Sequence, residues 1–494
     1  MQLNKLLEGI DHKLVKGTAD LEISGIAYDS RQVVPGTLFI CVKGLKTDGH
    51  LYVKQALENG AAAILAEREI EVGQGSSLLL TSDTRRSLAR LASNYYQNPS
   101  QSMRVIGVTG TNGKTTTTHL IQAILEEAGK KTGIMGTLYA RVGRTQKDMK
   151  HTTPEALEIE QFFNLCREEG VQYVVMEVSS HALDLHRVDE IAFNVAIFTN
   201  LTQDHLDYHQ TMNQYRDAKI RLFRMIPRER HNFAVINEDD PYAQDFKAAA
   251  GKSFSTYGLK NQADIAATNV QIDGKGTRFE VKHQNGVLNI NMKLVGIFSV
   301  YNALAAITFA LQEGINPSVI TSALEKVEGV AGRFEKVDCG QNFTVIVDYA
   351  HTPDGLENIL LTARQLATGR LITVFGCGGD RDRTKRPLMG EIAAGHSDFC
   401  VVTSDNPRTE DPEKIIADIL PGLDRVENSR YAIIADRREA IRHAIHLAKE
   451  DDLVVIAGKG HETYQLVKDQ VLDFDDRKIA AEFIQRKEYN AFGS

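Results

Sequence analysis

Short apolar runs alternate along this chain with stretches that have the 3.6-residue periodicity of amphipathic helices. The apolar runs are rich in valine and isoleucine, as buried parallel strands are. They lie at 104–109, 171–178, 194–199, 233–237, 343–349, 371–376, 398–404 and 453–458. Alternation of strands with helices predicts an α/β fold built on parallel sheets.

Most of the predicted strands end in polar or glycine-rich residues. Ligands of open α/β sheets bind beyond the carboxyl ends of the strands, so these ends are candidate binding segments. They are 110–116, 177–181, 199–205, 348–351, 376–382, 404–408 and 458–462. This number of polar strand ends in one chain indicates more than one substrate.

The length of the chain predicts several domains. A chain of 494 residues is too long for a single hydrophobic core. The polar stretch QNPSQS at 97–102 and the stretch EGVAGRFEKV at 328–337 are candidate joints. We therefore expect domains at 1–98, 99–332 and 333–494.

Charge and composition narrow the class of protein. A formal net charge of -8 argues against a general nucleic-acid binder, which needs a basic surface to neutralise phosphates. The first residues do not resemble a secretory leader, and no apolar run approaches the length that crosses a bilayer. Five scattered cysteines indicate neither a disulfide framework nor a zinc site. We expect a cytoplasmic monomer that does not insert into membranes.

The stretch VIGVTGTNGKTTTTH at 105–119 looks like a phosphate-binding loop with irregular spacing. The common pattern G-x-x-x-x-G-K-[ST] requires a glycine six positions before the lysine, and Val108 stands six before Lys114. A predicted strand precedes the glycines, and a predicted amphipathic helix follows them, with Gly129 as its C-terminal cap. The loop therefore has the setting that the motif requires.

The chemistry of this loop suits a nucleotide. Gly110 and Gly113 allow backbone N–H groups to turn toward a polyphosphate, and Lys114 supplies a mobile positive charge. Thr115 or Thr116 can offer a hydroxyl group to Mg²⁺. The alternative is a glycine turn with an exposed lysine.

GTNGKTTT resembles the ATP loop of the Mur ligases, the ATP-dependent amide-forming enzymes of bacterial cell-wall precursor synthesis, and of the related folylpolyglutamate synthetases. Further motifs of the chain follow in the order DSRQVVPGTLFICVKG, HTTPE, MEVSSHAL, NLTQDHLDYH, YRDAKIRLF, DYAHTPDGL, GCGGDRDRTKRPLMG, SDNPRTEDP and GKGHETYQ. Together they are similar to the Mur ligases that join meso-diaminopimelate to UDP-N-acetylmuramoyl-L-alanyl-D-glutamate. The resemblance covers nearly the whole chain.

The resemblance implies a three-domain architecture with a central P-loop ATPase domain and a Rossmann-like C-terminal domain, and it implies ATP and Mg²⁺ as cofactors. The implied catalytic residues are Lys114, Glu177, His205 and Lys219. The implied ATP-binding residues are Gly110, Thr111, Asn112, Gly113, Lys114, Thr115, Thr116, Asn302, Arg333 and Asp348. The implied metal ligands are Thr115, Glu177, His205 and Lys219, the last as a carbamate formed with CO₂.

Some of these assignments compete with other interpretations. A lone lysine such as Lys219 is normally a solvated surface residue, and only the motif favours a carbamate. His209 lies four residues after His205 and could form a metal pair with it on a helix. The resemblance places the metal on His205 alone, so we expect a structural role for His209. Asn302 is also compatible with an ordinary polar position inside a helix.

The resemblance also implies which residues bind the nucleotide-sugar peptide. Those for the uridine nucleotide are Ser30 and the backbone of Leu45, Lys46 and Thr47, and those for the muramoyl dipeptide are Thr152, Thr153, Ser179 and Arg187. Hydroxyl groups and an arginine suit phosphate and carboxylate oxygens. Leu185 departs from the family pattern, because many relatives carry a glutamine there, and this puts one polar contact with substrate in doubt.

An amino-acid pocket is implied in the last third of the chain. Its residues are Arg381, Asp405, Asn406, Pro407, Arg408, Gly458 and Glu462. Meso-diaminopimelate has two carboxylates and two amines, so two arginines can each clamp a carboxylate while acidic groups accept from an ammonium. Lysine has one carboxylate and would leave one buried arginine unpaired, which is costly.

The implied reaction is sequential. ATP phosphorylates the γ-carboxylate of D-glutamate, and the amine of diaminopimelate attacks the acyl phosphate to form the amide. Three alternatives remain at this point: a lysine-adding ligase of the same family, a folate-type glutamate ligase, and a nucleotide-gated binding module such as a GTPase-like switch. The guanine motif N-K-x-D of GTPases is absent from the sequence, which weakens the last.

Overall fold

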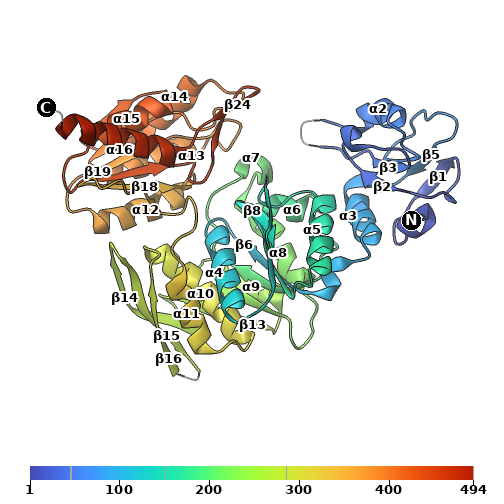
Figure 1. The fold of residues 1–494 in the computed structure, drawn as a ribbon, viewed down its shortest axis with the longest axis horizontal. Coiled ribbons are helices and arrows are strands. Elements are labelled where there is room, and N and C mark those ends of the chain that lie inside the picture. The colour runs from blue at the N-terminus through green and yellow to red at the C-terminus, as the bar shows by residue number, and fades with distance from the viewer. Residues whose placement is uncertain (45–46, 150, 285, 493–494) are drawn as a thin grey trace.

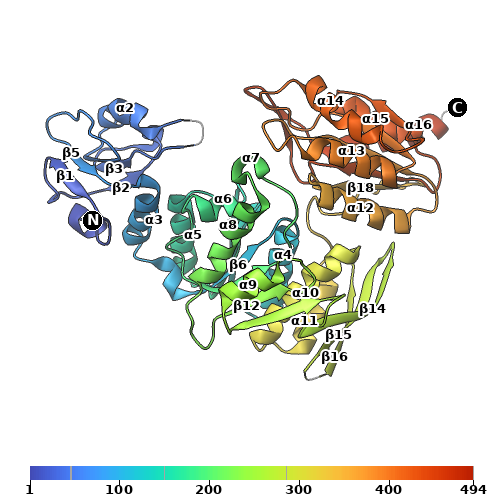
Figure 2. The ribbon, with the colours of Figure 1, turned by 180° about the vertical axis from the view of Figure 1, so that it is seen from behind.

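The structure is a computed structural model that describes residues 1–44, 47–149, 151–284 and 286–492. Three sheets, each with its own helices, follow one another along the chain, and the central unit lies between the other two (Figure 1). The same arrangement is seen from behind in Figure 2. In the described part of the chain no helix is long and apolar enough to cross a membrane.

The N-terminal unit has a five-stranded sheet in the order β1-β5-β4-β3-β2, in which only β1 runs antiparallel to its neighbour. Leucine, isoleucine and alanine side chains cover both faces of the sheet. Its strands and helices are α1 (Leu3–Leu6), β1 (Lys13–Lys16), β2 (Gly25–Ala27), β3 (Thr37–Ile40), α2 (Val53–Glu58), β4 (Ala63–Ala66), β5 (Ser77–Leu80) and α3 (Thr84–Tyr95).

The central unit has an eleven-stranded sheet in the order β16-β15-β14-β13-β12-β11-β6-β10-β7-β8-β9. The stretch from β14 through β13, β12, β11, β6 and β10 to β7 is parallel. At one end β15 and β16 extend the sheet in antiparallel fashion, and at the other end β8 and β9 do so. The strands are β6 (Arg104–Thr109), β7 (Thr132–Met135), β8 (Tyr139–Val142), β9 (Thr145–Asp148), β10 (Tyr173–Glu177), β11 (Phe193–Phe198), β12 (Phe233–Asn237), β13 (Phe254–Gly258), β14 (Ile265–Asp273), β15 (Gly276–His283) and β16 (Gly286–Met292).

Two apolar cores sandwich the central sheet, one under α4, α10 and α11 and the other under α5, α8 and α9. The helices are α4 (Lys114–Glu127), α5 (Ala156–Glu168), α6 (Ser180–Asp184), α7 (Leu206–His209), α8 (Met212–Met225), α9 (Ala243–Ala250), α10 (Ile297–Gln312) and α11 (Pro317–Lys326). Helix α4 is the helix expected after the phosphate loop. Gly129 follows it with φ 72°, a left-handed conformation that suits a helix end.

The C-terminal unit has a six-stranded sheet in the order β17-β18-β22-β19-β20-β21, parallel except for β17. Helices α12, α13 and α14 cover one face, and α15 and α16 cover the other. The elements are β17 (Glu335–Lys336), β18 (Thr344–Asp348), α12 (Pro353–Leu366), β19 (Leu371–Phe375), α13 (Lys385–His396), β20 (Phe399–Val402), α14 (Pro412–Leu423), β21 (Tyr431–Ile433), α15 (Arg437–Leu447), β22 (Leu453–Ala457), β23 (Tyr464–Val467), β24 (Gln470–Asp473) and α16 (Asp476–Phe492).

All eight apolar runs contain strands, and the predicted α/β class is confirmed. The antiparallel extensions were not predicted, because their strands are exposed on one face and lack long apolar runs. In β16, for example, buried and exposed positions alternate. Such strands gain stability from packing on one side only, which leaves a weaker signal in the sequence.

Candidate active site at the edges of two sheets

The phosphate-type loop requires glycine at two positions. It connects β6 to α4, and Gly110 and Gly113 have φ values of 151° and 86°. A Cβ atom on Gly110 would lie 1.9 Å from Thr199 Oγ1, and one on Gly113 would lie 2.3 Å from Asn302 Oδ1. A side chain at either position would therefore displace its neighbours and strain the backbone.

Two lysines from distant segments meet at this loop. Lys114 Nζ donates to the carbonyl oxygens of Gly110 (2.9 Å) and Thr111 (2.8 Å). Lys219 Nζ, on α8, donates to the same Gly110 oxygen at 2.7 Å. The Lys219 side chain is buried, and burial together with the nearby charge of Lys114 lowers its pKa well below the usual value. A buried lysine without an acidic partner in contact is thereby favoured as a neutral amine.

Glu177 lies at the carboxyl end of β10 and is fully buried. Its carboxylate accepts hydrogen bonds from the backbone N–H (2.8 Å) and the hydroxyl (3.0 Å) of Thr137. A Cβ atom on Gly136 would lie 2.2 Å from Glu177 Oε1, so the carboxylate also needs a glycine beside it. The carboxylate is held in place before any ligand binds.

His205 precedes α7 and has a left-handed backbone conformation, with φ 56°. Its Nε2 lies 3.3 Å from Asp204 Oδ2. Burial lowers the pKa of His205 to about 3, which outweighs the opposing effect of Asp204, so the imidazole is neutral at pH 7. A neutral imidazole is the form that binds a metal ion.

His209 is also buried, but its surroundings differ. Its Nε2 lies 2.9 Å from Ser180 Oγ, and its ring centroid lies 5.3 Å from that of Tyr215. These contacts occupy the imidazole within the protein. They agree with the expectation that His209 has a structural role.

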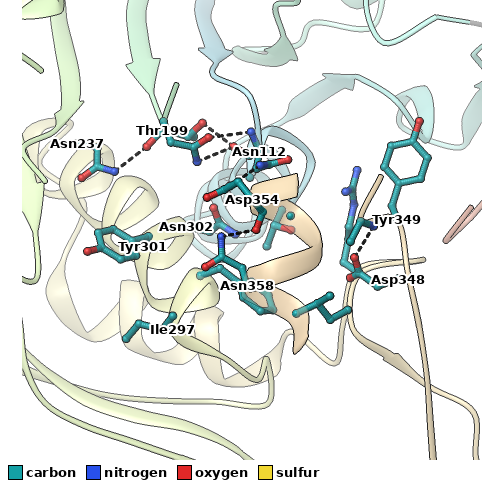
Figure 3. A pocket seen from close by; sticks show the side chains of 18 of the residues that line it. Asn112, Thr199, Asn237, Ile297, Tyr301, Asn302, Asp348, Tyr349, Asp354 and Asn358 are labelled. Carbon is teal, nitrogen blue, oxygen red and sulfur yellow. Dashed lines mark hydrogen bonds between the residues drawn. The ribbon is translucent and has the colours of Figure 1, made fainter. Parts of the chain in front are cut away.

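A cavity of about 240 Å³ lies between the central and C-terminal units (Figure 3). Among the predicted ATP-binding residues, those that line it are Asn112, Gly113, Thr116, Asn302, Arg333 and Asp348. The structure adds lining residues outside the candidate segments of the sequence, among them Asn237, Phe298, Tyr301, Asp354 and Asn358. Their aromatic and amide groups are the kind that contact a nucleoside.

Contacts between the two units cross this cavity. Asn112 Nδ2 donates to Asp354 Oδ2 at 2.7 Å, and Arg333 Nη2 donates to Thr115 Oγ1 at 3.0 Å. The Arg333 guanidinium also lies 4.7 Å from the centroid of the Tyr349 ring. The C-terminal unit therefore places an arginine directly against the phosphate-type loop.

Asp348 differs from a free ligand-binding carboxylate. Its Oδ2 accepts from the N–H of Phe334 and its Oδ1 from that of Ala350, both at 2.7 Å. Both oxygens are thus engaged with the backbone of the C-terminal unit. Asp348 therefore lines the cavity and also holds the backbone of the cavity wall in place.

The residues predicted to bind the muramoyl dipeptide gather beside Glu177. Thr152 Oγ1 lies 3.0 Å from Thr137 Oγ1, and Thr153 Oγ1 donates to the Glu177 carbonyl oxygen at 2.8 Å. Ser179 caps α6, where its hydroxyl accepts from the N–H of Ala182 at 3.2 Å. Arg187 donates to the Thr153 carbonyl oxygen at 3.0 Å and pairs with Glu155. Leu185 lies directly after α6 and is half-buried.

The predicted uridine contacts lie in the N-terminal unit. Ser30 is buried, and its hydroxyl donates to Gln55 Oε1 at 2.7 Å. Thr47 Oγ1 lies 2.9 Å from the hydroxyl of Tyr52. Leu45 and Lys46 lie outside the described residues. No contact joins Ser30 or Thr47 to the dipeptide residues among the described hydrogen bonds, so this part of the predicted site stays a separate patch.

Two arginines lie side by side in the C-terminal unit. A Cβ atom on Gly378 would lie 2.9 Å from Arg408 Nη1 and 3.7 Å from Arg381 Cγ. Arg408 has φ 54° and donates to the Gly379 carbonyl oxygen at 2.8 Å. Burial and the charge of Arg381 lower the pKa of Arg408. Two adjacent cations can bind an anion together.

Acidic and amide groups complete this pocket. Asn406 Nδ2 donates to Glu462 Oε2 at 2.8 Å, and Asp405 Oδ2 would lie 2.6 Å from a Cβ atom on Gly458. The Pro407 carbonyl oxygen would lie 2.0 Å from a Cβ atom on Gly379, so the two loops approach closely. The predicted amino-acid residues therefore do lie together, on the carboxyl ends of β19, β20 and β22.

Comparisons with known proteins agree with this geometry. The sequence matches three family descriptions in succession: the Mur ligase family catalytic domain at residues 22–96, the Mur ligase middle domain at 108–310, and the Mur ligase glutamate ligase domain at 332–460. A curated relative from Syntrophomonas wolfei is 67% identical over 487 residues, which cover 99% of this chain and 100% of the relative.

The chain belongs to the Mur ligase family. The Syntrophomonas relative is named UDP-N-acetylmuramoyl-L-alanyl-D-glutamate--2,6-diaminopimelate ligase. A relative of the same name from Caldanaerobacter subterraneus is 47% identical and covers 99% of this chain and 100% of its own. A solved structure of that name is 33% identical, with a TM-score of 0.67 over 99% of both chains.

More distant solved structures share the fold. MurF from Acinetobacter baumannii has a TM-score of 0.71 at 21% identity, over 98% of both chains. A folylpolyglutamate synthase from Mycobacterium tuberculosis, complexed with ADP and AMPPCP, has a TM-score of 0.63 at 21% identity and covers 76% of this chain. The predicted three-domain Mur ligase architecture is thus confirmed.

Proposed function

We propose that this Mur ligase joins meso-diaminopimelate to the D-glutamate γ-carboxylate of UDP-N-acetylmuramoyl-L-alanyl-D-glutamate, at the expense of ATP, in peptidoglycan precursor synthesis. The observation that carries the proposal is full-length identity of 67% to a ligase of that name, in a chain whose paired arginines suit a second carboxylate. We propose that the enzyme is a cytoplasmic monomer.

The site supports a reaction in two steps. The γ-carboxylate attacks the γ-phosphorus of ATP, which releases ADP and leaves an acyl phosphate. The amine of diaminopimelate then attacks the acyl carbon, loses a proton, and the bond from carbon to the phosphate oxygen breaks to give amide and phosphate. Lys114 and Arg333 lie at the loop where negative charge develops, and fixed positive charge stabilises it there.

The proposed reaction also uses Mg²⁺. Thr115, Glu177, His205 and Lys219 would hold the ion or ions, with Lys219 as a carbamate. The described residues include no group of three or more acidic, histidine or cysteine side chains that could hold a metal. A carbamate on Lys219 would add two oxygens to this set, and the neutral amine favoured by burial is the form that reacts with CO₂. When bound, Mg²⁺ supplies charge neutralisation for the phosphoryl oxygens.

The remaining assignments belong to the same proposal. The domain limits 1–98, 99–332 and 333–494 are supported by the three sheets, which lie within those ranges. The predicted ATP, dipeptide and diaminopimelate contacts are supported by the clustering of their residues at strand ends. We propose that Ser30 and the segment 45–47 contact the uridine nucleotide.

The proposed function is tested by phosphate release from ATP and Mg²⁺ with the UDP-linked dipeptide, in parallel with meso-diaminopimelate, L-lysine or no amino acid. We expect turnover with diaminopimelate alone. Turnover with lysine instead would assign the chain to the lysine-adding members of the family. An absence of turnover with any amino acid would overturn the ligase proposal.

The carbamate is tested by Lys219→Ala. We expect a loss of activity of about 10³-fold, because a charge-neutralising ligand is removed, and partial rescue by a short carboxylic acid without CO₂. Lys247→Ala is the control, since Lys247 lies on α9 and pairs with Glu238. Full activity in Lys219→Ala would refute the carbamate.

A further inference from the structure

A buried lysine that the proposed mechanism does not use lies among the acidic residues of the amino-acid pocket. Lys459 directly follows Gly458 at the end of β22, and its side chain is fully buried. Its Nζ donates to Glu462 Oε2 at 2.8 Å and to Asn406 Oδ1 at 3.1 Å. The ammonium also lies 5.5 Å from the centroid of the Tyr464 ring. One cation thus contacts three residues around the pocket.

The lysine takes up only part of the acceptor capacity of the pocket. Asn406 Nδ2 donates to the same oxygen of Glu462 as Lys459 does, so Oε2 receives both protein donors. Among the described residues, no hydrogen bond reaches Glu462 Oε1, and Asp405 Oδ2 is buried without a partner. Two carboxylate oxygens therefore remain for an ammonium supplied by a ligand.

The cost of burying an ammonium makes this arrangement informative. Charged groups lose hydration when they are buried, so they persist only where hydrogen bonds and opposite charges compensate. In the same unit, Arg437 pairs with Asp476, and both side chains are fully buried. That pair is internal to the scaffold, whereas Lys459 pairs with Glu462, a residue of the proposed ligand pocket. The lysine therefore controls a group that faces the ligand.

Removal of Lys459 would leave the two carboxylates of Asp405 and Glu462 near each other without their shared cation. Burial and the charge of Asp405 raise the pKa of Glu462, while Lys459 lowers it. Without the lysine, Glu462 would gain a proton or turn away from Asp405. Either change removes an acceptor for an ammonium.

We propose that Lys459 is a positioning residue that holds Glu462 as a fixed acceptor for the distal ammonium of the substrate. The proposal rests on the function proposed above and deepens it, because it assigns the basis on which a diamino acid is preferred. A substrate that lacks the distal amine gains nothing from this acceptor. The variant without the lysine therefore loses selectivity for the diamino acid.

The test compares meso-diaminopimelate with 2-aminopimelate, which lacks the distal amine, in the full-length enzyme with both other substrates present. In Lys459→Met we expect the KM for meso-diaminopimelate to rise about tenfold or more, and the preference for it over 2-aminopimelate to fall by a similar factor. The kcat with meso-diaminopimelate and the KM for ATP stay within about threefold of the unchanged enzyme. A purely structural role would alter stability and all substrates together.

Further variants separate charge from packing. Lys459→Arg keeps the charge and is expected to recover much of the preference for meso-diaminopimelate over 2-aminopimelate. If Lys459→Arg discriminates between the two substrates as poorly as Lys459→Met, the proposal is contradicted. In a Glu462→Gln background, Lys459→Met is expected to change the preference by less than about twofold, because the lysine acts through Glu462. If Lys459→Met does not fold, Lys459→Gln, which keeps a neutral donor, replaces it in every comparison.

Lys487→Met is the matched control, because Lys487 donates to the carbonyl oxygens of Ile445 and Ala448 away from the pocket. Its substrate preference should equal that of the unchanged enzyme. An unchanged enzyme that shows no diaminopimelate-dependent turnover would refute the proposed function. If the unchanged enzyme prefers meso-diaminopimelate and Lys459→Met shows the same preference, the role of Lys459 is refuted and the proposed function is not.

Discussion

The central unit meets its two neighbours in different ways. On the N-terminal side, Ala156 and Leu157 of α5 belong to the same apolar core as Leu88 and Leu91 of α3. On the C-terminal side, the two apolar cores of the C-terminal unit include no residue of the central unit. One interface continues a hydrophobic core, and the other does not.

Polar contacts dominate the C-terminal side. Besides the contacts of Asn112 and Arg333 described above, Lys385 Nζ lies 3.4 Å from Asp204 Oδ1, and both side chains are buried. An apolar contact also crosses, with the Phe298 and Phe334 ring centroids 6.2 Å apart. Hydrogen bonds and ion pairs can be exchanged for contacts with water or ligand at little net cost, whereas separation of a shared apolar core exposes hydrophobic surface. The C-terminal interface is therefore the one suited to open and close around ATP.

The difference predicts a large catalytic effect from the polar interface. Arg333→Met removes the positive charge that the C-terminal unit places against Thr115, and we expect kcat to fall about 10²- to 10³-fold. Urea unfolding should change little. Arg364→Met, which breaks an exposed pair with Asp398 on the same unit, is the control and should retain activity. A near-normal kcat in Arg333→Met would show that closure delivers no catalytic charge.

The N-terminal interface should respond in stability instead. Leu157→Ala removes a buried side chain from the shared core, and we expect a loss of about 2–4 kcal/mol in the free energy of unfolding. ATP binding, measured by titration calorimetry, should be retained. Leu361→Ala on α12 is the control, because Leu361 is exposed. If Leu157→Ala lowers the free energy of unfolding by less than about 1 kcal/mol, the N-terminal interface is no more hydrophobic than the C-terminal one.

One residue at the N-terminal interface should show a pH dependence. Glu160 on α5 is buried beside Ser93 of α3. Burial raises the pKa of Glu160 to about 8; a hydrogen bond from Ser93 and the charge of Arg167 oppose this rise, and the charge of Glu190 adds to it. A raised pKa in the folded state means that the protonated form stabilises the fold at low pH, and that this stabilisation is lost as pH rises toward 8.

Glu160→Gln should therefore stabilise the protein by on the order of 1–3 kcal/mol at pH 8 and by much less at pH 5. Urea unfolding at both pH values measures the difference. Glu168→Gln, on the same helix, is the control and should show no such trend. An equal effect of Glu160→Gln at both pH values would mean that Glu160 stays in one protonation state.

Local features of the chain were predictable from its sequence. The loop between β6 and α4 is contiguous, and its glycines, its lysine and the helix behind it lie within one short segment. Buried strands such as β18 and β22 are continuous apolar runs, which the sequence displays directly. The amino-acid pocket was predicted through resemblance, since its residues come from three separate strand ends.

Contacts between distant segments were decided by the tertiary structure alone. Lys219 and Lys114 share the Gly110 carbonyl oxygen although Lys219 is 109 residues from Gly110. Lys459 meets Asn406, and Asp354 meets Asn112, only when other loops pack beside them. The sequence by itself determined which segments form strands, helices and the phosphate loop, because these depend on neighbouring residues. Which side chains share a pocket, and with what charge, depends on burial and on groups that folding brings together.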